Sequence, residues 1–118
     1  MNHKKPTSQM LGRFQPWHDG HTALFKKITE ETGQTMIMVR CMEQDDSNPY
    51  NYEEVSQKIQ NELQKEGFTF KLEYDIMKVP NVTNIGYGRD VGYTIKQYDL
   101  GEDIHQISAT KIRDASKH

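Results

Sequence analysis

Two histidines near the amino terminus stand in a pattern that could handle phosphate. His18 and His21 lie three residues apart in the segment 12–21, which reads GRFQPWHDGH. The segment falls where we expect a strand to end and a helix to begin, and ligands of open α/β sheets bind at that edge. A helix start offers unpaired N–H groups and partial positive charge, so the imidazoles there should stay neutral. Both could donate hydrogen bonds to a phosphate whose negative charge grows during a reaction.

The residues beside the histidines suit the same task. Gly12 and Gly20 would allow the backbone to approach a ligand closely. We expect the nucleotide-binding part of this segment to consist of Gly12, Arg13, Phe14 and Gly20. Each feature alone has a plainer explanation, since a histidine in a turn is usually solvated and Arg13 could form a surface ion pair. His-x-x-His also occurs in zinc sites, but no cysteine pair accompanies it, and we assign no metal ligand.

A second segment of this character lies late in the chain, at residues 107–113, which read ISATKIR. Ser108 is a natural helix N-cap, and Thr110 and Lys111 would follow in the first turn. Hydroxyls, a lysine and Arg113 at a helix start can cradle phosphate. An ordinary capped surface helix would have the same sequence. We expect Ser108 and Thr110 to bind nucleotide, and Lys111 and Arg113 to belong to the catalytic set with the two histidines.

The elements that must position these segments alternate between strand and helix. We expect strands at residues 8–14, 35–41 and 68–79, a helix before Gly33, and a second helix at 53–66. Residues 84–93 indicate a loop with a short strand inside it, and a truncated helix should begin at Ser108. This order predicts an α/β fold, Rossmann-like, with a mainly parallel sheet flanked by helices, as one small domain over residues 1–118.

Composition narrows the class of protein. The chain has 118 residues, a net charge of −2 and one cysteine, so no internal disulfide can form and a reducing, cytoplasmic location is expected. No signal peptide or membrane span is expected. Residues 1–27 hold five Lys or Arg against one acid, which is too sparse for a nucleic-acid-binding stripe. The core should be thin, which leaves room for a self-associating face and a homo-oligomer.

The segment 12–21 resembles the signature of the cytidylyltransferase-like nucleotidyltransferases, which is His-x-Gly-His after the first strand. Here it reads His18-Asp19-Gly20-His21, and the preceding Gly-Arg-Phe-Gln-Pro looks most like the nicotinamide-mononucleotide adenylyltransferase branch. ISATKIR is similar to the family's second signature, Ile-Ser-x-Thr-x-x-Arg. Between the two, Asn48-Pro49-Tyr50 looks like the family's Asn-Pro-(Phe/Tyr) segment, although a polar loop would explain it equally well. Family members usually continue further after the Arg113 position.

The resemblance implies transfer of a nucleoside monophosphate from a nucleoside triphosphate to a phosphate-bearing small molecule, with release of pyrophosphate. The look of the first signature favours the adenylyl group of ATP as the group transferred. Nicotinamide mononucleotide is one candidate acceptor, and Arg89 a candidate ligand for the acceptor's phosphate. Mg²⁺ would bridge the substrate phosphates.

Other functions remain open at this point. A cytidylyltransferase or a phosphopantetheine adenylyltransferase would share the fold. A fragment of a class I aminoacyl-tRNA synthetase would share a His-x-Gly-His-like element, but the chain is too short for a tRNA-reading body. A non-catalytic nucleotide-binding module would bind a nucleotide without releasing pyrophosphate.

Overall fold

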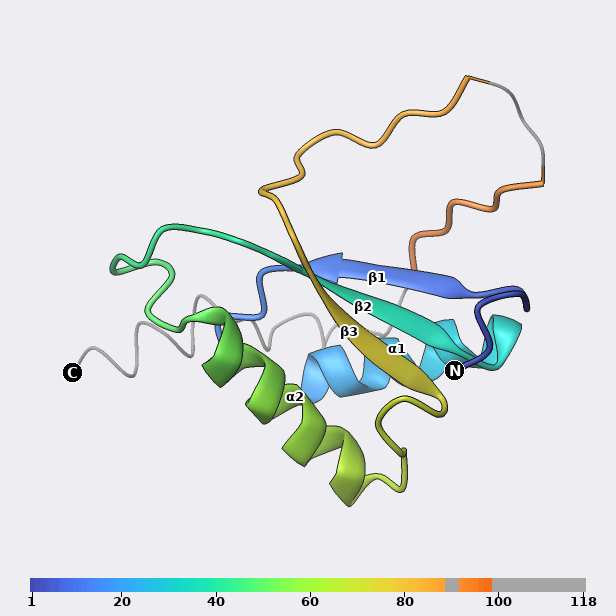
Figure 1. Cartoon of the computed structure of the whole chain (residues 1–118), viewed down its shortest axis with the longest axis horizontal. Coiled ribbons are helices and arrows are strands. Elements are labelled where there is room, and N and C mark those ends of the chain that lie inside the picture. Colours follow the sequence, from blue (N-terminus) through green and yellow to red (C-terminus); the bar gives the residue numbers. More distant parts are fainter. Residues whose placement is uncertain (89–91, 99–118) are drawn as a thin grey trace.

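The computed structural model describes residues 1–88 and 92–98 (Figure 1). The elements follow one another as β1 (Ser8–Gly12), α1 (Asp19–Thr32), β2 (Thr35–Arg40), α2 (Tyr52–Lys65) and β3 (Tyr74–Val79). The three strands form one sheet in the order β1-β2-β3, and both pairings are parallel. The predicted α/β fold with a parallel sheet is therefore confirmed for the described residues.

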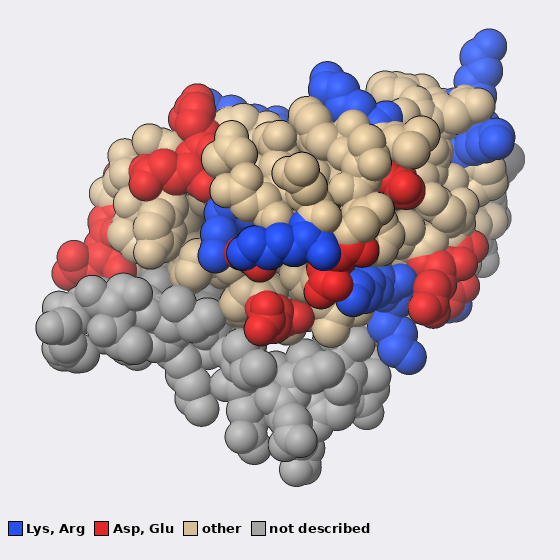
Figure 2. Space-filling model, turned by 90° about the horizontal axis from the view of Figure 1, so that it is seen from below, with Lys and Arg blue, Asp and Glu red and all other residues tan. Residues whose placement is uncertain are grey.

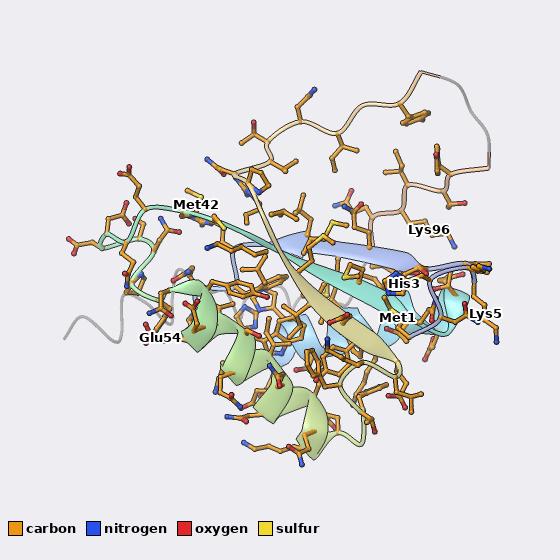
Figure 3. All side chains as sticks on the ribbon, viewed as in Figure 1. Met1, His3, Lys5, Met42, Glu54 and Lys96 are labelled. Atoms are coloured by element: carbon orange, nitrogen blue, oxygen red, sulfur yellow. The ribbon has the colours of Figure 1, made fainter. Side chains whose placement is uncertain are left out.

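Both helices lie on the same side of the sheet (Figure 1). The chain passes from β1 to β2 and then to β3 in one direction, and right-handed crossovers in one direction place successive helices on one face. The carboxyl ends of the strands and the amino ends of the helices consequently meet at one end of the molecule. Met42 and Glu54, on either side of the start of α2, lie toward this end, and Met1 and Lys96 lie toward the other (Figure 3).

The core lies between the sheet and the two helices. In β2, Thr35, Ile37 and Val39 are buried while the residues between them are half-buried, as expected when one face of a strand is covered. Helix α2 contributes one apolar stripe at four-residue spacing, as predicted, and its members are Val55, Ile59 and Leu63. Gly33 ends α1 with φ of 88°, a left-handed conformation that glycine adopts without strain.

The third strand is shorter than predicted. It begins at Tyr74, because the chain turns through Gly67 (φ 89°) and Lys71 (φ 70°) before it enters the sheet. The apolar residues that suggested an earlier start serve another purpose: the ring of Phe68 packs edge-on against Phe25, with centroids 4.9 Å apart. A short strand was expected within residues 84–93. Residues 84–88, 92 and 93 form no strand, and residues 89–91 lie outside the described residues.

Charges of both signs are interspersed on the face shown in Figure 2, and the described part of this face carries no continuous basic stripe. Exposed ion pairs join neighbouring groups, such as Lys26 with Glu66 at 3.2 Å and Lys58 with Glu62 at 3.0 Å. Over residues 1–88 and 92–98, no helix combines the length and the apolar character needed to cross a membrane.

Candidate functional site

The turn between β1 and α1 owes its shape to Gly12 and Phe14. Phe14 has φ of 53°, a left-handed conformation that costs a non-glycine residue about 1 kcal/mol or more. Its ring folds back over Gly12, where an added Cβ would lie 2.8 Å from two ring carbons. Glycine at position 12 is therefore required by the neighbouring ring, a reason that the sequence pattern did not reveal. Phe14 itself is buried, so its part in the site is to shape the turn.

His18 and His21 lie together at the start of α1. Their rings stack with centroids 3.8 Å apart and planes inclined by 30°. His18 is the N-cap residue, and its Nδ1 accepts a hydrogen bond from the Gly20 N–H at 3.0 Å. In return, the N–H of His18 donates to Nδ1 of His21 at 3.1 Å. The pair thus forms a reciprocal capping box built from two imidazoles, which satisfies backbone donors that a helix start leaves unpaired.

These hydrogen bonds decide which ring nitrogen carries the proton. Because each Nδ1 accepts a backbone N–H, a neutral ring must carry its proton on Nε2. Burial and, to a smaller extent, the adjacent His18 lower the pKa of His21 to about 3. Burial also lowers the pKa of His18, against the opposing charge of Asp19. Both rings are neutral near pH 7, and neither Nε2 has a hydrogen-bond partner among the described residues.

The ring of His21 packs against two aromatic side chains. Its ring meets Phe14 edge-on with centroids 5.0 Å apart, and Trp17 lies 5.4 Å away on another side. Trp17 is almost fully buried, and its Nε1 donates to Oγ1 of Thr22 at 2.8 Å. The alternative that these histidines are merely solvated therefore does not hold. Both have a structural role, which holds their rings in one orientation.

Hydrogen bonds hold the loop after β2 against the same turn. The buried amide of Gln15 forms two hydrogen bonds with the backbone of Tyr50: Nε2 donates to the carbonyl oxygen at 2.9 Å and Oε1 accepts from the N–H at 2.9 Å. Arg13 donates through Nη1 to Oδ1 of the buried Asn48 at 3.3 Å. The Asn48-Pro49-Tyr50 segment, 35 residues away in sequence, thus lies beside the histidine turn.

Gln15 was not among the predicted site residues. The sequence did contain a signal for its role. Gln15 stands between Phe14 and Pro16 in an otherwise apolar stretch, and a polar side chain that is buried there requires a hydrogen-bond partner. Arg13 was expected to form a surface ion pair if it had no role with nucleotide. Its hydrogen-bond partner is instead the neutral amide oxygen of Asn48.

Five other predicted site residues cannot be placed in this geometry. Arg89 and the carboxyl-terminal set Ser108, Thr110, Lys111 and Arg113 lie outside the described residues. Among the residues that are described, no group of three or more His, Cys, Asp or Glu side chains gathers in a way that could hold a metal ion.

Comparison of the chain with protein-family models finds no match, and comparison with curated proteins finds no similar sequence. The argument for a function therefore rests on the residues and their geometry.

Proposed function

We propose that the protein is a nucleotidyltransferase that transfers a nucleoside monophosphate, AMP from ATP in the first instance, to a phosphate-bearing small molecule. The observation that carries the proposal is the pair His18 and His21: two neutral, stacked imidazoles whose Nε2–H groups are free, at a helix start on the carboxyl edge of a parallel sheet. In the sequence, this pair belongs to the His-x-Gly-His pattern that resembles the cytidylyltransferase-like family.

The sheet order supports a Rossmann-like arrangement. The order β1-β2-β3 with both helices on one face is that of half of a doubly wound sheet, in which nucleotides bind outside the carboxyl ends of the strands. The proposed site consists of the β1–α1 turn and the loop before α2 that Gln15 holds to it, and it lies at those ends.

The family resemblance implies a direct transfer in which these groups would act. An oxygen of the acceptor's phosphate attacks the α-phosphorus, a new P–O bond forms, and the bond to pyrophosphate breaks. Negative charge grows on the non-bridging oxygens, where two fixed N–H donors stabilise it without having to reorganise. Their neutral state suits this role, since each donates from Nε2 while Nδ1 keeps the capping bond.

Further parts of the proposal concern groups that lie outside the described residues. Ser108, Thr110 and Arg113 would hold the β- and γ-phosphates, with Lys111 nearby, and Arg89 would contact the acceptor. Mg²⁺ would be held mainly by the phosphates and by water, where it supplies charge neutralisation.

The deciding experiment is a pyrophosphate-release screen of ATP and CTP against phosphorylated acceptors, nicotinamide mononucleotide included, with Mg²⁺. We expect release with at least one acceptor, and its loss in His21→Ala but not in Lys27→Ala, a change at an exposed position of α1. Release with CTP alone would favour a cytidylyltransferase. Equal release by wild type and His21→Ala would contradict the proposed role of the histidines.

A second candidate is a non-catalytic nucleotide-binding module. It is favoured by the capping box, which gives both histidines a structural reason to be present. Such a protein would be stabilised by ATP yet release no pyrophosphate with any acceptor, so the same preparation separates the two candidates.

A further inference from the structure

Two arginines mark the carboxyl edge of the sheet. In the parallel register Gly12 pairs with Val39, so Arg13 and Arg40 each stand one residue beyond this pair on neighbouring chain segments. Strands pair about 4.8 Å apart, which brings the two backbones close at this point. Because Thr35, Ile37 and Val39 face the helices, alternation sends the side chain of Arg40 to the opposite face of the sheet, alongside Met38.

Arg40 has an incomplete set of partners. Its Nη2 donates to Oδ1 of Asn81 at 2.7 Å. Its Nε is buried and has no hydrogen-bond partner among the described residues. A buried donor without an acceptor costs free energy, so a native protein that keeps one commonly has a use for it.

Both arginines are oriented by amide oxygens, and neither has a carboxylate partner among the described residues. Arg13 is held by the amide oxygen of Asn48, and Arg40 by that of Asn81. An amide oxygen fixes the direction of a guanidinium yet leaves its charge uncompensated. Over residues 1–88 and 92–98, no carboxylate lies within ion-pair distance of either arginine, whereas the ion pairs that do form all involve lysines, which are Lys26, Lys58, Lys65 and Lys96.

We propose that Arg40 forms a binding site for a phosphomonoester, and that this site holds the phosphate of the acceptor. The assignment to the acceptor rests on the proposed function. The histidines are proposed to act at the α-phosphate, so the phosphate of the acceptor has to be held by other groups. The histidines lie at the start of α1, on the helix side of the edge, and Arg40 leaves the sheet on the other side. Asn81 is the positioning residue for Arg40.

Inorganic phosphate is the probe for this site. Thermal unfolding and calorimetric titration would be measured with increasing phosphate, in the presence and in the absence of saturating ATP. The variants are Arg40→Met, which keeps an apolar stem of similar length, and Lys27→Met, which removes the same charge from an exposed position of α1. Arg40→Lys and Asn81→Ala complete the set.

We expect phosphate to stabilise the wild type saturably and Arg40→Met to bind it at least about tenfold more weakly, since a charge-assisted two-pronged contact is lost. Lys27→Met should respond like the wild type. Without phosphate, Arg40→Met should melt no lower than the wild type, because an unpaired buried donor has been removed. A purely structural Arg40 would instead melt lower when replaced. Arg40→Lys should bind phosphate more weakly despite its charge, and Asn81→Ala should weaken binding less than Arg40→Met.

The proposal is overturned if phosphate does not stabilise the wild type, or if Arg40→Met and Arg40→Lys both retain its full response. It is also overturned if saturating ATP abolishes the response, since phosphate would then be bound on the nucleotide side. Failure of the proposed function has a different signature: ATP would not bind, while the dependence of phosphate binding on Arg40 would persist.

Discussion

At the residue scale, the two histidines have a structural role in one ring nitrogen, and the proposed function gives them a chemical role in the other. Nδ1 of each ring accepts a backbone N–H and caps α1, and Nε2 of each remains available as a donor. A substitution can therefore remove one role and keep the other. This separation is the means of testing whether the pair acts on phosphate or only on the helix.

We expect His21→Ala to lower kcat by roughly 10²–10³ with a smaller change in KM, because the donor matters most when charge builds on the phosphate. The same change should cost about 1 kcal/mol of stability through the lost capping contact. Steady-state pyrophosphate release and urea unfolding would measure the two effects.

His18→Thr is the matched comparison, because threonine is itself an N-cap residue. It should keep most of the stability that His18→Ala loses. If His21→Ala turns over normally on an acceptor that the wild type uses, the pair is structural only.

The lowered pKa values predict how stability depends on pH. In the unfolded chain His21 has its ordinary pKa of 6.5, whereas in the folded chain its pKa is lowered to about 3. Between these values protons bind preferentially to the unfolded chain, so the free energy of unfolding falls as the pH drops below about 6.5. The stabilisation is fully present above that pH. For one such histidine the loss between pH 6.5 and 5 should be roughly 1–2 kcal/mol.

Urea unfolding at pH 7, 6, 5.5 and 5 would measure this loss, with His21→Gln and His3→Gln compared to the wild type. His21→Gln should flatten the dependence, while His3→Gln, a change at an exposed position, should leave it as it is. Parallel curves for His21→Gln and the wild type would show that His21 titrates normally in the folded protein.

At the scale of elements, the β1–α1 turn is a packed unit whose shape places the histidines. Its members are tied to one another and to the loop before α2 by the ring of Phe14 and the amide of Gln15. A change within this unit should therefore move the start of α1 as well as lower stability.

Gly12→Ala should destabilise the protein by about 1–3 kcal/mol, because the new methyl group would overlap the Phe14 ring. Gly86→Ala is the control, since an added Cβ there meets nothing within 4 Å. Thermal unfolding would compare the two variants. Equal melting temperatures for Gly12→Ala and the wild type would mean that the ring does not occupy this position in solution.

Gln15→Ala should release the loop that carries Asn48. It leaves the N–H and the carbonyl of Tyr50 without their partner, at a cost of about 1–3 kcal/mol. Hydrogen exchange at the Tyr50 amide should become faster, while Gln57→Ala, a change on the exposed face of α2, should not affect it. Unchanged exchange in Gln15→Ala would show that the loop is held by other contacts.

At the scale of the whole molecule, the described strands form a single parallel sheet with both described helices on one face. In sheets of this kind ligands bind at the carboxyl ends of the strands. A nucleotide bound there would contact the β1–α1 turn, the loop before α2 and the ends of the strands. Binding to the folded state alone raises the melting temperature, so the identity of the nucleotide can be read before any acceptor is known.

We expect ATP to stabilise the protein more than CTP does, because the first signature looks like the adenylyl-transferring branch. At a concentration of 100 times Kd, the gain would be about 2.7 kcal/mol. Thermal unfolding with increasing ATP or CTP, with Mg²⁺ present, would measure it. Saturable stabilisation by CTP and none by ATP would overturn the assignment to the adenylyl branch.

The sequence alone was sufficient for the order and type of the described elements. Helix α2 follows from the four-residue spacing of Val55, Ile59 and Leu63, and the end of α1 follows from Gly33, because these signals are local. The position of the histidines at a helix start was readable for the same reason. Local spacing could not show where the third strand begins, since Phe68 is apolar to pack against Phe25 and not to pair in the sheet.

The tertiary structure alone decided how the site is built. The burial that lowers the pKa of His21 depends on Phe14 and Trp17 folding around it. The contacts of Gln15 with Tyr50 and of Arg40 with Asn81 join segments 35 and 41 residues apart. Such contacts leave no periodic trace in the sequence, because they are set by the parallel pairing that brings distant strand ends to one edge.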